Sequence, residues 1–164
     1  MIVKVQKAPG AGGAFVVRLD SEGALLLRSL PARLREVLGR TGAGDRLLGR
    51  LFPPAYAHPE REAEYRRLLG DDLIRRKLEC IDAFEKTLSS WKTGLFTVTV
   101  TIPPEEFELW LGFVNDMRLV LGIELDIRDE SWETSFDPAH PQARDLALLH
   151  WLSWLEDELL RAHG

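Results

Sequence analysis

The stretch PPEEFELWLGFVNDMRLVLG (residues 103–122) decides the fold, because its apolar residues repeat at helical spacing and cover a wide face. The two prolines at its start suit the first turn of a helix, where backbone N–H groups have no intrahelical partner. A face this wide is typical of a helix that packs on several sides, so we expect a central helix here. Its apolar positions are Phe107, Trp110, Leu111, Phe113, Val114, Met117, Val120 and Leu121.

Three polar residues, Asn115, Asp116 and Arg118, interrupt this apolar helix. At about 100° per residue, Asn115 and Arg118 share a face while Asp116 points about 200° away from Arg118, which excludes an ion pair within the helix. Buried charges need partners, so each charge must meet another element, and Asp71 or Asp72 is a candidate partner for Arg118. We interpret the three residues as a structural polar core that fixes how the helix docks; the alternative is a binding site.

Alternating segments predict a small antiparallel sheet. Residues 1–20 have the pattern of a β-hairpin with a glycine-rich turn, and residues 95–102 have that of a third strand rich in β-branched side chains. A hairpin alone is marginally stable in water, so one face of the sheet must pack on helices. The alternation assigns four residues of the third strand to that face: Phe96, Val98, Val100 and Ile102.

Helical spacing prevails elsewhere, over residues 21–92 and 103–162. Pro31 predicts either a kink or a boundary between two short helices, and Gly70 predicts a break or bend. The 164 residues suffice for one substantial core and not for two comfortable domains. We therefore expect a single domain, residues 1–164, of the mainly helical α+β class, with five or six helices packed on a three-stranded antiparallel sheet.

Composition bears on location and partners. No apolar run approaches the roughly 20 residues of a membrane span, and the N-terminus lacks a signal-peptide pattern, so we expect a cytoplasmic protein without a membrane partner. Residues 1–80 hold 15 Lys and Arg against 10 Asp and Glu, a balance of +5, whereas residues 81–164 hold 6 against 16, a balance of −10. Either the two halves face each other in the fold, or one face is offered to a charged partner.

The sequence shows no signature of a metal site, a cofactor site or a catalytic group. The four histidines lack zinc-binding spacing, and the glycine-rich segment 39–46 has Asp45 and Arg46 where a phosphate loop needs Lys followed by Ser or Thr. Six arginines between Arg28 and Arg50 suggest DNA binding, but no DNA-binding motif accompanies them. We therefore expect nucleic acid not to be the partner, and keep a DNA-binding module as the least favoured alternative.

Two other functional hypotheses differ in class. The proline-rich segment FPPAYAHPE (52–60) is expected to be extended and rigid, and predicts an exposed contact surface for a protein partner. The residues of this surface are Phe52, Pro53, Pro54 and Tyr56. The alternative is a small enzyme, whose cleft is expected near Asp116, Arg118 and His150. We favour the contact surface and expect the protein not to be an enzyme.

Cys80 is the only cysteine, which forbids a disulfide within the chain. Lys77, three residues before it, and Arg75 and Arg76 in the preceding turn are expected to lower the pKa of the thiol and favour the reactive thiolate. Cys80 is therefore a candidate lone redox thiol, and the alternative is a buried, inert cysteine.

The chain contains, in order, LFPPAY (51–56), EYRRL (64–68), DDL (71–73), WLGFVNDMRLVLG (110–122) and HWLSWLEDELL (150–160). With these stretches it resembles an actinobacterial family of unknown function represented by the oxidative-stress regulator AosR. The resemblance implies a cytoplasmic, non-enzymatic regulatory or adaptor protein that acts through protein–protein contacts, with an extracytoplasmic-function sigma factor as the partner class. Thiol-switch members of that family use two closely spaced cysteines, whereas this chain has one, so it cannot form an intramolecular disulfide switch.

Overall fold

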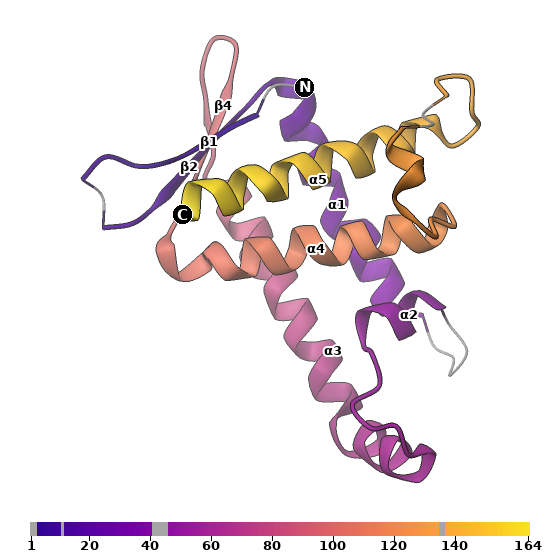
Figure 1. Ribbon diagram of the computed structural model, residues 1–164. Helices are drawn as coiled ribbons and strands as arrows, with labels where there is room; N and C mark the ends of the chain where they lie inside the picture. Colours follow the sequence, from indigo (N-terminus) through magenta and orange to yellow (C-terminus); the bar gives the residue numbers. More distant parts are fainter. Residues whose placement is uncertain (1–2, 11, 41–45, 135–136) are drawn as a thin grey trace.

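A four-stranded antiparallel sheet lies at one end of the computed structural model, which describes residues 3–10, 12–40, 46–134 and 137–164 (Figure 1). The strands follow the order β1-β2-β4-β3. Their bounds are Val3–Lys7 (β1), Phe15–Leu19 (β2), Lys92–Thr93 (β3) and Val98–Ile102 (β4). The prediction of three strands was wrong by one, because a two-residue strand such as β3 is too short to show alternation.

Five α-helices and two short 3-10 helices account for most of the other described residues. The central position belongs to α4, which contacts α1, α2, α3 and α5. In Figure 1, α5 runs alongside α4, and α3 extends from the sheet past α4. The α-helices are α1 (Ser21–Leu38), α2 (Arg46–Leu51), α3 (Pro59–Ser89), α4 (Phe107–Glu124) and α5 (Ala143–His163), and the 3-10 helices are Pro104–Glu106 and Glu130–Glu133.

One continuous hydrophobic cluster fills the space between the sheet and the helices. Trp110 and Phe113 of α4 are fully buried. The ring centre of Phe84, on α3, lies 4.5 Å from that of Trp110 and 3.9 Å from that of Phe113. The wide apolar face of α4 is therefore buried, as its spacing predicts. The inner face of the sheet adds Val5, Phe15, Val17, Leu19, Val98, Val100 and Ile102 to the cluster.

The helix breaks that were one alternative at Gly70 and Pro31 do not occur. The long helix α3 is continuous through Gly70, where an added Cβ would meet nothing within 4 Å. Glycine costs a helix about 1 kcal/mol, which weakens it locally without breaking it. Pro31 lies buried inside α1, which is a single helix on both sides of it.

The strand predicted over 95–102 begins later than its alternation suggests. β4 starts at Val98, and the backbone N–H of Gly94 donates to the carbonyl of Thr97 at 2.7 Å, which closes a turn before the strand. Phe96 lies in this turn and is 80% exposed. Its assignment to the buried face was wrong, because the alternating pattern continues beyond the residues that pair in the sheet.

Candidate functional site

Asp116 connects the central helix α4 to α3. Its two carboxylate oxygens lie 2.9 Å and 2.8 Å from Nζ of Lys77, and its side chain is nearly buried. Burial raises the pKa of Asp116 above its ordinary value, and Lys77 offsets part of that rise by favouring the charged form. The carboxylate is thus held by one cation on a neighbouring helix.

Arg118 connects the other side of α4 to α5. Its Nε donates to Oγ of Ser153 at 3.1 Å, and its Nη1 donates to the carboxylate of Glu156. The prediction that Arg118 pairs with Asp71 or Asp72 was wrong, because Arg118 pairs with Glu156 of α5. Asp72 pairs with Arg75 within α3. Figure 1 shows α4 lying next to both helices that these two charged residues reach.

Asn115 is exposed, so the prediction of a three-residue polar core was wrong for this residue. The residues of the alternative enzyme cleft, Asp116, Arg118 and His150, have separate partners. His150 packs its ring 4.4 Å from that of Trp132, while Asp116 and Arg118 contact α3 and α5. Asp116 and Arg118 thus reach different helices from α4.

Two arginines of the basic half, Arg33 and Arg35, meet acids of the other half. Arg33 binds Glu124 and also Asp145, whose Oδ1 lies 3.2 Å from Nη1. Arg35 binds both Asp82 and Glu85, and the guanidinium of Arg28 lies 4.7 Å from the ring centre of Trp91. Arg46 belongs to the segment whose side chains the structure leaves undescribed, and Asp45 lies outside the described residues. The two halves therefore face each other through ion pairs, which leaves Arg33 and Arg35 engaged rather than free for DNA.

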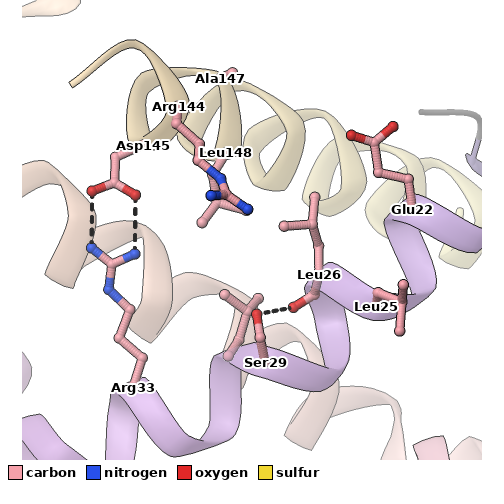
Figure 2. Close-up of a pocket in the computed structure, with 10 residues that line it drawn as sticks. Glu22, Leu25, Leu26, Ser29, Arg33, Arg144, Asp145, Ala147 and Leu148 are labelled. Atoms are coloured by element: carbon pink, nitrogen blue, oxygen red, sulfur yellow. Dashed lines mark hydrogen bonds and ion pairs between the residues drawn. The ribbon is translucent and has the colours of Figure 1, made fainter. Parts of the chain in front are cut away.

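A groove of about 560 Å³ runs between α1 and α5 (Figure 2). Leu25, Leu26, Leu30, Ala147 and Leu148 make it largely apolar. The ion pair between Arg33 and Asp145 closes one end, and Figure 2 shows Arg144 reaching over the groove beside Leu148. Besides its apolar residues, the groove is lined by Arg144 and Glu22 and by the paired Arg33 and Asp145.

A second pocket, of about 380 Å³, lies beside Cys80 and Lys77. Burial raises the pKa of the Cys80 thiol, and the lowering by Lys77 is smaller, so the predicted shift toward thiolate was wrong in direction. Phe52 lines the same pocket and is buried, with its ring centre 5.9 Å from Nζ of Lys77. The prediction that Phe52 belongs to an exposed contact surface was therefore wrong, whereas Pro53, Pro54 and Tyr56 are exposed as predicted.

The first part of α3, residues 59–80, forms a surface that the sequence did not reveal; we call it the α3 arm. All four buried residues of α3 lie from Ile81 onward. The arm displays Leu68, 63% exposed, and Leu69, 40% exposed. Both line a shallow pocket with Tyr65 and Tyr56, whose rings lie 5.7 Å apart. The available signal was the low apolar content before Ile81, which is typical of a helix with no core to face.

The described ranges contain neither a metal-binding cluster nor a membrane-spanning helix. No group of three or more His, Cys, Asp or Glu side chains there has an arrangement that could hold a metal ion. None of the helices that the structure describes combines the length and the apolar character needed to cross a bilayer.

The fold defines a mainly helical α+β protein, and its most exposed large apolar residues, Leu95 and Phe96, lie on the turn before β4. The chain belongs to the family described as a domain of unknown function, DUF2017, whose model matches residues 6–163. Comparison with curated proteins and with solved structures found no match.

Proposed function

We propose that this protein is a non-enzymatic, cytoplasmic regulatory or adaptor protein that acts through protein–protein contacts, with the α3 arm and Tyr56 as its docking surface. The observation that carries the proposal is the arm itself. No residue of 59–80 is fully buried, and Leu68 and Leu69 are left in water, although Leu73, Ile74 and Leu78 near the end of the arm pack against the core. In Figure 1 the arm runs out beyond α4 and α5, next to the connection that follows α2.

Local contacts hold the start of the arm, whereas the ion pair between Lys77 and Asp116 ties its end to α4. Glu62 binds Arg66 and accepts the backbone N–H groups of Ala55 and Tyr56, both at 2.9 Å, which fastens the preceding connection to the helix. Ion pairs between neighbours on a helix contribute only about 0.2–0.5 kcal/mol each. An amphipathic partner that covers Leu68 would add apolar burial that the fold itself does not supply.

The partner class is drawn from the resemblance. LFPPAY (51–56) and NDMRLVLG (115–122) resemble the family of the actinobacterial oxidative-stress regulator AosR. We propose an extracytoplasmic-function sigma factor as the partner and a stress response as the setting. The last two residues of LFPPAY, Ala55 and Tyr56, donate their backbone N–H groups to Glu62 of the arm. One of the most specific stretches of the resemblance is therefore next to the proposed surface.

The proposal is tested by affinity capture from the native cytoplasm, followed by binding measurements with each purified candidate. The double variant Leu68→Ser/Leu69→Ser should weaken binding at least tenfold. Leu160→Ser, at a leucine of α5 that is also exposed, is the matched control and should bind as the wild type does. Circular dichroism checks that both variants fold. Unchanged binding by the folded double variant would reject the arm, whereas an arm-dependent partner of another class would reject only the sigma factor.

A further inference from the structure

The turn that joins β3 to β4 carries the two most exposed large apolar side chains among the described residues. Leu95 is 88% exposed and Phe96 is 80% exposed. Figure 1 shows this hairpin projecting from the sheet, away from the helices. Neither residue supports the core, so their apolar character has no explanation within the fold.

Behind the turn, three cations form a row across the outer face of the sheet. The strand register pairs Lys4 with Arg18, Arg18 with Thr99, and Thr99 with Lys92. Directly paired residues of antiparallel strands lie on the same face, and like charges in such pairs are destabilising. Lys4, Arg18 and Lys92 are all exposed, and within the described part of the chain none of them has an ion-pair partner.

The row and the turn share a geometry. Because Lys4, Arg18 and Lys92 are in register, they form a line that crosses the strands roughly at right angles. When the turn approaches a flat surface end-on, this line is roughly parallel to that surface. Thr99, in the same row, is four residues from Leu95, which limits their separation along the strand to about 13 Å. Side chains that enter a membrane interface typically do so by about 5–10 Å. With the turn inserted to that depth, the cations would lie near the lipid headgroups.

We propose that this end of the sheet binds the surface of an anionic lipid bilayer, with Leu95 and Phe96 entering the interface and the three cations contacting headgroup phosphates. A bilayer suits the turn better than a groove on a protein does. The side chains of consecutive turn residues point in diverging directions. A rigid groove on a protein would cover only one of the two, whereas the fluid apolar layer of a bilayer can surround both. That none of the described helices could cross a bilayer does not bear on this contact, because interfacial binding needs only a shallow apolar insertion and neighbouring cations.

Vesicle co-sedimentation with the full chain tests the proposal. Vesicles with about 30% phosphatidylglycerol should bind the protein at least tenfold more tightly than vesicles of phosphatidylcholine alone. The binding should weaken as NaCl rises from about 0.05 M to about 0.5 M, because salt screens exposed charges. Leu95→Ser/Phe96→Ser and, separately, Arg18→Gln/Lys92→Gln should each reduce binding at least tenfold, while Leu25→Ser, an exposed leucine of α1, should not.

Circular dichroism confirms that each variant is folded, and soluble polyglutamate serves as a competitor. Equal binding to both kinds of vesicle would overturn the proposal, as would unchanged binding of the folded Leu95→Ser/Phe96→Ser variant. A third contrary result is tight, cation-dependent binding of polyglutamate together with no binding to anionic vesicles, which would assign the row to an acidic protein. None of these results depends on the α3 arm.

Discussion

Lys77 on α3 and Asp116 on α4 form an ion pair with Nζ 2.8 Å from Oδ2, and only the lysine end is substantially open to solvent. The two partners differ in what they lose when the pair is broken. A lysine left alone can turn toward water, whereas a carboxylate left alone stays in a low-dielectric site. The pair therefore predicts an asymmetric response to mutation.

Lys77→Met should destabilise the protein by about 3 kcal/mol at neutral pH, because it leaves Asp116 buried and charged. Asp116→Asn should cost less than about 1 kcal/mol, since the amide oxygen can still accept from Lys77. Chemical denaturation of both variants and the wild type measures the difference. Equal losses for the two variants would show that the carboxylate is solvated in the native state.

The same pair has a pH signature. Burial raises the folded-state pKa of Asp116, so the native state holds this proton more tightly than the unfolded chain does. The stability of the wild type relative to Asp116→Asn should therefore fall as the pH rises from the ordinary aspartate pKa through the raised folded value. The penalty of Lys77→Met should grow over the same interval. Denaturation curves collected from about pH 4 to about pH 7 test both statements; a relative stability that rises with pH would contradict them.

Arg118 on α4 and Glu156 on α5 should be energetically coupled. Both side chains are largely sheltered, so we expect a coupling energy of about 1 kcal/mol that weakens in high salt. A double-mutant cycle with Arg118→Met and Glu156→Gln measures it. The exposed pair Glu64 and Arg67 on the α3 arm is the comparison and should give no more than about 0.5 kcal/mol. A zero coupling at Arg118 would remove its predicted role in docking α4 on α5.

Cys80 should be a slow nucleophile. Burial raises the pKa of its thiol, so only a small fraction is thiolate near neutral pH. Alkylation by iodoacetamide should be slower than for free cysteine and should accelerate with pH. Asp116→Asn should speed the reaction and Lys77→Met should slow it, because Asp116 raises this pKa and Lys77 lowers it. A rate above that of free cysteine would restore the redox hypothesis for this residue.

Periodicity predicted the parts of the fold in which one face is buried. The apolar stripe of α4 and the inner face of β4 were predicted correctly, because a buried face requires apolar residues at regular intervals in the sequence. The partners of Asp116 and Arg118 were not predicted, since they depend on which helices pack together. Phe52 was misplaced for a related reason: the segment reads as extended, but only the fold shows that its ring packs near Lys77.

Continuity of α3 through Gly70 gives a further prediction. Gly70→Ala should slow hydrogen exchange of the backbone amides of the α3 arm, because alanine favours a helix by about 1 kcal/mol and the added Cβ meets nothing within 4 Å. Gly112→Ala, at an equally open site on α4, is the control and should leave exchange in the arm unchanged. Faster exchange around Gly70→Ala would indicate a bend that glycine permits.

The most direct test of the central claim, that the α3 arm is a protein-docking surface, is site-specific photo-crosslinking in living cells. A benzophenone amino acid replaces Leu68 in one experiment and Leu160, the exposed control on α5, in another. The account predicts a discrete adduct with one heterologous protein from position 68, its loss on competition with untagged wild type, and no such adduct from position 160. No adduct from position 68, or one formed equally from both positions, would contradict it.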